Sequence, residues 1–233
     1  GGNCDTTTGD PGMAITRQQI IEAIHDGARL ANERYEAWTG GAWITDSGVE
    51  QMMVACIAET IHNSYHAPEK KDQREGWLAM EIPFSGIKEW SQAKARQGRN
   101  PKILKDRHRA DLVLFNKRNL PICVIEMKRQ WSRRACLKDL DRLHVLVSRL
   151  SHRDGGSLRR GFLATTVVRQ DKGRVSAEER ISDQVAKIRV AVQQHFEGRE
   201  INWAFHPGPT VPYSFGGWAW ASLCVEVSAR RRA

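Results

Sequence analysis

The residues best suited to chemistry lie in two apolar segments that a short polar turn separates. Asp111 stands in the run Arg109-Ala-Asp-Leu-Val-Leu-Phe, and Glu126 and Lys128 end the run Ile122-Cys-Val-Ile-Glu-Met-Lys. Both runs have the apolar and β-branched composition of strands, and residues two apart in a strand share a face. Glu126 and Lys128 are therefore expected to point the same way.

A hairpin of these two strands places the Asp111 carboxylate near that of Glu126, because paired strands lie about 4.8 Å apart. Mg²⁺ takes one or two carboxylates and keeps waters and substrate phosphate as its other ligands. Such an ion activates a bound water and neutralises charge on a phosphate, while the Lys128 ammonium can orient or deprotonate that water. A Glu-x-Lys pair alone is most often a surface pair, but the preceding Asp-bearing strand favours a metal site.

This pattern resembles the PD-(D/E)XK nuclease superfamily, which includes restriction endonucleases and many DNA-repair and phage-defence nucleases. The family core is a helix, a three-strand meander, a helix and a further strand. Its acid comes at the second strand and its acid-x-Lys at the third. The resemblance covers the chain from about residue 47 to residue 196. It implies Asp111 and Glu126 as metal ligands, Lys128 as the catalytic lysine, and Mg²⁺ as the cofactor, with Mn²⁺ as a substitute.

The chain departs from the family pattern at one position. The proline that usually precedes the family's aspartate is absent, because Arg109-Ala110 stands there. Many family members depart in the same way, so the assignment of Asp111 is kept.

The resemblance also implies a glutamate from the first core helix, for which the chain offers two candidates. Glu50 lies close to the apolar stripe of Met53 and Ile57, and Glu59 lies on a different side. We favour Glu50 as a third metal ligand. Gln130, just beyond the strand, is expected to hydrogen-bond the scissile phosphate or the water; a surface amide is the alternative.

Basic residues surround these candidate acids in the sequence. The chain has 36 Lys and Arg against 27 Asp and Glu, a formal net charge of +9. Such a balance attracts polyanions: nucleic acid or an anionic membrane surface. Each of these residues is a solvated surface charge when considered singly, but together the following are expected to contact DNA phosphates: Lys105, Arg107, Arg109, Arg129, Arg133 and Arg134.

Hydrophobic periodicity predicts the elements that must position the site. Helices are predicted over residues 15–35, 47–62, 135–150 and 177–196, with Ser47 as the cap of the second. Strands are predicted over residues 77–84, 110–116, 122–128 and 161–169. Residues 85–105 indicate a long polar connection, and residues 203–227 a proline-rich stretch that ends in a last strand from residue 218. This order predicts a single-domain α/β fold with a mixed sheet flanked by helices. The resemblance to PD-(D/E)XK nucleases implies that this sheet is restriction-endonuclease-like.

The division of the chain follows from the same patterns. Residues 1–14 are expected to be a flexible or artificially added N-terminus, residues 15–46 an N-terminal helical extension, and residues 47–233 the nuclease-like domain. No apolar run approaches the roughly 18 residues of a membrane span. Five widely spaced cysteines predict free thiols and a reducing cytoplasm.

Together these features predict a metal-dependent nuclease that hydrolyses DNA phosphodiester bonds. We expect an endonuclease of a restriction, defence or repair system, acting as a homodimer or as a subunit of a larger nuclease system. The alternative is a catalytically silent nucleic-acid-binding module or subunit on the same fold. A structural protein whose basic surface docks a different partner is the third interpretation.

Overall fold

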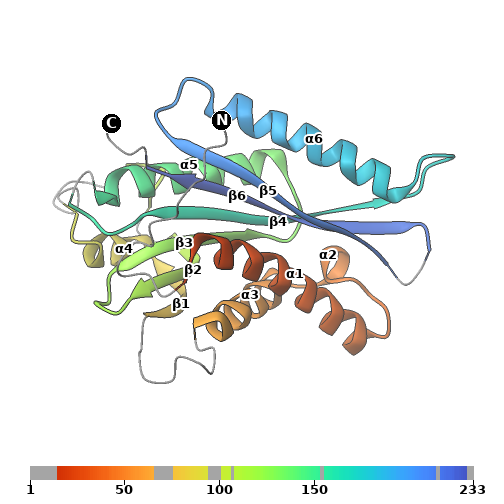
Figure 1. Cartoon of the computed structure of the whole chain (residues 1–233), viewed down its shortest axis with the longest axis horizontal. Helices are drawn as coiled ribbons and strands as arrows, with labels where there is room; N and C mark the ends of the chain where they lie inside the picture. The colour runs from red at the N-terminus through yellow and green to blue at the C-terminus, as the bar shows by residue number, and fades with distance from the viewer. Residues whose placement is uncertain are drawn as a thin grey trace, which may run out of the picture.

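Six strands form one mixed sheet in the computed structural model, in the order β1-β2-β3-β4-β6-β5 (Figure 1). The structure describes residues 15–65, 76–93, 101–105, 108–152, 155–213 and 216–229. The strands are β1 (Gly76–Pro83), β2 (Arg109–Asn116), β3 (Pro121–Lys128), β4 (Arg160–Gln170), β5 (Asn202–Pro212) and β6 (Trp218–Ser228).

Strand β3 lies inside the sheet and sets its geometry. It closes an antiparallel meander with β1 and β2, and it pairs in parallel with β4. Strands β6 and β5 then add in antiparallel fashion. Residues 121–127 of β3 are all buried, as expected for a strand that helices cover on both faces.

Helices cover both faces of this sheet (Figure 1). Helices α1 (Arg17–Thr39), α2 (Ile44–Ser47) and α3 (Glu50–Tyr65) lie on one face, where α1 and α3 pack on Leu112 and Ile125. Helices α4 (Phe84–Trp90), α5 (Arg133–Leu150) and α6 (Ala177–Phe196) lie on the other face with Val113 and Val124. The core therefore has two apolar layers with the sheet between them.

The predicted α/β class with a mixed sheet between helices is confirmed, and the structure corrects two of the predicted elements. Residues 85–105 were expected to be a connection, but α4 occupies residues 84–90. It buries Phe84 and Ile87, a single pair of apolar residues that is too short a pattern to predict a helix. Ser47 was expected to cap the second helix, but it ends the short helix α2 instead. The polar stretch 94–100 lies outside the described residues, as do residues 1–14.

Strand β5 was missed because its prolines suggested a loop. Pro207, Pro209 and Pro212 all lie within this strand, which is the last of the sheet. Proline lacks the N–H of the ladder, so strands at the edge of a sheet tolerate it. The register of β5 against β6 also shifts between Pro207 and Thr210, which absorbs the Pro-Gly-Pro run as a bulge.

The packing of α1 on α3 gives a test of this fold. A Cβ added at Gly27 of α1 would lie 2.5 Å from Ile57 Cα of α3, so the helices must move apart in Gly27→Ala. We expect a destabilisation of about 1–3 kcal/mol, measured by chemical denaturation. Gly86→Ala in α4 is the matched control, because its Cβ meets nothing closer than 3.6 Å. Equal stability of the two variants would contradict the close approach of the two helices.

Candidate active site

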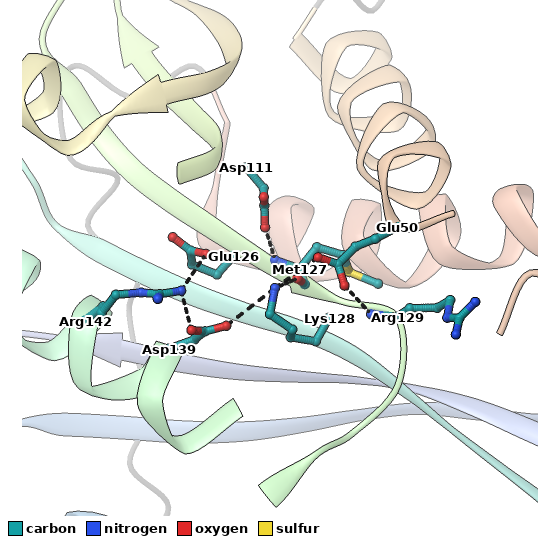
Figure 2. A network of polar contacts seen from close by, with 8 residues as sticks. All are labelled: Glu50, Asp111, Glu126, Met127, Lys128, Arg129, Asp139 and Arg142. Atoms are coloured by element: carbon teal, nitrogen blue, oxygen red, sulfur yellow. Dashed lines mark hydrogen bonds and ion pairs between the residues drawn. The ribbon is translucent and has the colours of Figure 1, made fainter. Parts of the chain in front are cut away.

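Asp111 of β2 and Glu126 of β3 approach each other near the C-terminal end of β3 (Figure 2). The pair Leu112–Ile125 sets the register, so Asp111 and Glu126 are the next residues along the two antiparallel strands. Asp111 Oδ2 accepts a hydrogen bond of 2.6 Å from the backbone N of Met127. Glu126 is only 2% exposed, and its Oε1 has no hydrogen-bond partner among the described residues.

Lys128 and Glu50 join this carboxylate pair from the end of β3 and the start of α3. Lys128 Nζ donates to Glu50 Oε1 at 3.0 Å and to the carbonyl oxygen of Met127 at 2.6 Å. The other Glu50 oxygen accepts from the backbone N of Arg129 at 2.9 Å (Figure 2). Glu50 therefore binds both the Lys128 side chain and the backbone that follows it.

A tight turn brings Glu50 to this position. A Cβ at Gly48 would lie 2.4 Å from Ile44 Cγ1, so only glycine fits where the chain leaves α2 and turns into α3. The alternative helix acid, Glu59, lies elsewhere and pairs with Arg34 through two hydrogen bonds of 2.6 and 2.9 Å. Of the two candidate glutamates, the structure places Glu50 beside Lys128.

Two charged residues of α5 complete the network, and the sequence reasoning missed both. Asp139 Oδ2 lies 3.6 Å from Lys128 Nζ, and its other oxygen pairs with Arg142. Arg142 Nη2 in turn lies 3.5 Å from Glu126 Oε2 (Figure 2). Asp139 is 2% exposed on the apolar stripe of α5. A carboxylate on such a stripe is rare unless it is paired, and this was the signal available in the sequence.

Glu81 of β1 is a further acid beside the site that the sequence reasoning did not identify. The flanking pairs Met80–Leu112 and Ile82–Ala110 place Glu81 opposite Asp111 on the neighbouring strand. Its φ of 54° lies in the left-handed region, which is uncommon for a residue with a side chain. Its charge contributes to the raised pKa of Asp111.

Burial disfavours the charged forms of the two central carboxyls. It raises the pKa of Glu126 to about 8, with the nearby Asp111 charge adding to the effect. Burial also raises the pKa of Asp111 to about 6, although the hydrogen bond from Met127 opposes the change. Asp111 and Glu126 therefore repel each other in a region that has little water to screen them.

The charges of the network fit a divalent cation. Glu50, Asp111, Glu126 and Asp139 bring four negative charges when ionised, and Lys128 and Arg142 bring two positive charges, which leaves two negative charges uncompensated. In the described part of the chain no group of three or more His, Cys, Asp or Glu residues is arranged to hold an ion. The site thus offers Asp111 and Glu126 as a pair, and Mg²⁺ commonly uses one or two carboxylates.

Lys128 keeps its proton in this environment. Burial alone lowers the pKa of Lys128, but the hydrogen bond to Glu50 and the charges of Glu50, Asp139 and Asp111 outweigh burial and leave the pKa raised. The side chain is therefore an ammonium, which can donate hydrogen bonds and supply positive charge.

The side chains of Gln130 and Arg129 turn away from this network, toward α2 and the Gly48 turn that follows it. Gln130 Nε2 donates to the carbonyl oxygen of Thr45 at 2.5 Å, so the structure does not bring it to Glu126 or Lys128. The guanidinium of Arg129 donates to the carbonyl oxygen of Gly48 at 2.5 Å.

The other basic residues expected to bind DNA lie mostly on the surface. Arg109 is exposed, and its guanidinium is 3.5 Å from the carbonyl oxygen of Glu81. Lys105, Arg133 and Arg134 are exposed, whereas Arg107 lies outside the described residues.

Comparison with protein-family models, curated proteins and solved structures finds no match for this chain. None of the described helices combines the length and the apolar character that a bilayer crossing requires. The function is therefore inferred from the geometry of the site itself.

Replacing Glu126 tests the electrostatic description of the site. A carboxyl with a raised pKa keeps its proton in the folded protein but loses it in the unfolded chain, so it destabilises the fold as pH rises above its ordinary value. The penalty grows by about 1.4 kcal/mol per pH unit until the raised pKa is reached. In EDTA, Glu126→Gln should therefore melt at a higher temperature than the natural protein at pH 8, with a smaller gain at pH 5.

Glu200→Gln is the control, because Glu200 is exposed in the loop before β5. It should change the melting temperature little at either pH. Added Mg²⁺ at pH 8 should stabilise the natural protein more than Glu126→Gln. A gain for Glu126→Gln that is equal at pH 5 and pH 8 would show that Glu126 is not held in an unfavourable charged state.

Proposed function

We propose that this chain is a metal-dependent nuclease that hydrolyses phosphodiester bonds in DNA. The observation that carries the proposal is the buried pair Asp111 and Glu126 beside the Lys128 ammonium. When its four acids are ionised, the network has two negative charges that none of its side chains compensates. A structural ion-pair network gains nothing from such an excess, whereas a site for a hard divalent cation requires it.

The topology supports a restriction-endonuclease-like fold as part of the proposal. The meander β1-β2-β3, followed by α5 and the parallel strand β4, is the order that the resemblance to PD-(D/E)XK nucleases implies. Asp111 lies on the second strand and Glu126 on the third, where the resemblance implies the two acids.

In this proposal Asp111 and Glu126 hold the metal ion. Glu50, the third ligand that the resemblance implies, instead accepts hydrogen bonds from Lys128 and the Arg129 backbone and so positions the lysine. Bound Mg²⁺ supplies an acidified water and neutralises charge on the scissile phosphate. Because the Glu126 pKa is about 8 without a cation, loading the site displaces a proton at neutral pH.

Lys128 acts in this proposal as a hydrogen-bond donor and not as a base, because its pKa is raised. Its ammonium orients the attacking water or a phosphate oxygen and stabilises the charge that grows in the transition state. Asp139 and Arg142 are positioning residues: Asp139 holds Lys128, and Arg142 bridges Asp139 and Glu126.

Cleavage of circular DNA tests the proposal. Supercoiled plasmid and single-stranded circles are incubated with Mg²⁺, Mn²⁺ or EDTA, because only an endonuclease opens a circle. We expect the natural protein to cut with Mg²⁺ or Mn²⁺ and not in EDTA. Asp111→Asn and Lys128→Ala should each lower the rate on the order of 10²-fold or more, since each removes charge at the reacting phosphate.

A matched pair of glutamates on α3 sharpens the test. Glu50→Gln should reduce cleavage, and Glu59→Gln should not, because Glu59 pairs with Arg34 away from the site. If no circle is cut, linear DNA is tested next. Failure there, or residual activity that Asp111→Asn leaves unchanged, overturns the catalytic proposal and favours a nucleic-acid-binding module.

A further inference from the structure

A shallow basic groove lies between β4 and α6, on the face of the sheet that α5 and α6 cover. Its volume is about 330 Å³, and none of its residues belongs to the basic stretch around the candidate acids in the sequence. The residues that line it are Arg169, Arg180, Asp183, Gln184 and Lys187.

The two arginines of the groove are fixed by the backbone. Arg169 Nη1 donates to the carbonyl oxygen of Val168 at 2.7 Å, and Arg180 Nη1 donates to that of Gln170. In the described chain no ion pair neutralises Arg169, Arg180 or Lys187, although the exposed acid Asp183 lies in the same groove.

The three positive charges of the groove outnumber its one carboxylate, Asp183. Burial lowers the pKa of Arg169, and the neighbouring Arg180 charge lowers it further. An anion bound between the two guanidinium groups would relieve this repulsion, and phosphate matches the planar array of donors that arginine presents.

The groove is aligned with the candidate active site along β4. Lys128 pairs with Thr165, and Arg169 follows four residues later on the same face of the strand. Four residues of strand span about 13 Å, which is roughly four base-pair steps of duplex DNA. Strand β4 thus runs from the candidate site to the N-terminal half of α6 (Figure 1).

Two further exposed basic residues lie at the start of α5, which begins close to β4. The backbone N of Trp131 donates to the carbonyl oxygen of Thr166 at 2.8 Å, so α5 starts beside this part of β4. Arg133 and Arg134 are exposed in the first turn of α5.

We infer that the groove of Arg169, Arg180 and Lys187 binds backbone phosphates of the nucleic acid whose scissile phosphate lies at Lys128. The inference rests on the proposed function for the position of the scissile phosphate. The groove is open and lies in line with the proposed position of the scissile phosphate at Lys128, which suits a continuous polyanion better than a small free anion. The groove therefore extends the proposed binding surface beyond the basic residues that lie near Asp111 and Glu126 in the sequence.

Binding measurements without cleavage test this inference. A labelled 30-base-pair duplex and a 30-nucleotide single strand are titrated in EDTA, and again with Ca²⁺ in place of Mg²⁺, over a series of salt concentrations. The double variant Arg169→Ala/Arg180→Ala should bind the duplex on the order of tenfold or more weakly at 0.1 M salt. The slope of log K against log salt should become shallower by about 0.9 for each phosphate that the variant no longer neutralises.

Two controls separate this effect from net charge and from misfolding. Lys117→Ala/Arg118→Ala removes the same charge at the β2–β3 turn, at the opposite end of β3 from Lys128, and should change the slope little. Arg169→Lys/Arg180→Lys keeps both positive charges and should restore most of the salt slope. If the two guanidinium groups were needed only to hold the structure, lysine would not restore it. Thermal melting confirms that each variant is folded.

The outcomes distinguish this inference from the proposed function. Reduced binding and slope only in Arg169→Ala/Arg180→Ala support the groove, even if the natural protein does not cut DNA. Equal effects of the two alanine double variants, or no nucleic-acid binding by the natural protein, overturn it, whatever the cleavage assay shows.

Discussion

The burial of Glu126 beside Asp111 is the constraint on which the rest of the site depends. A carboxylate with 2% exposure loses most of its hydration, and a second carboxylate on the adjacent strand adds repulsion. The surrounding structure holds the pair in place, because β3 lies inside the sheet with an apolar helix layer on each face. The site therefore depends on stability that the apolar layers provide, as is common where polar groups are buried for function.

The network around this pair draws on four separate segments. Lys128 comes from the end of β3, Glu50 from the start of α3, Asp139 from α5, and Asp111 from β2. Each contact fixes one side of the Lys128 ammonium or of a carboxylate, so the acids and the lysine occupy defined relative positions before any ligand arrives. This preorganisation matters in the proposed chemistry, because groups that stabilise a transition state act best when they need not rearrange.

The candidate site and the chain as a whole have opposite net charges. The chain as a whole carries a formal charge of +9, yet the network at the end of β3 has two negative charges in excess when ionised. A polyanion is attracted to the surface and repelled by the bare site. In the proposed nuclease a divalent cation removes this repulsion, so metal and substrate favour each other's binding. The groove of Arg169, Arg180 and Lys187 extends the attraction away from the acids.

The sequence by itself determined the elements whose patterns are long or regular. The helix over 177–196 and the strands that carry Asp111 and Glu126 were predictable, because periodicity of 3.6 or 2 is a local property. Strand β5 could not be predicted, because only a strand at the edge of a sheet tolerates its prolines and the sequence does not show which strand is at the edge. Helix α4 could not be predicted either, because it is too short to show a repeated apolar pattern. The sequence also predicted that Asp111 and Glu126 lie close together, because a short turn joins their two strands into a hairpin. Only the tertiary structure decided between Glu50 and Glu59, added Asp139 and Arg142, and aligned Arg169 with Lys128, because these contacts join segments that no local pattern relates.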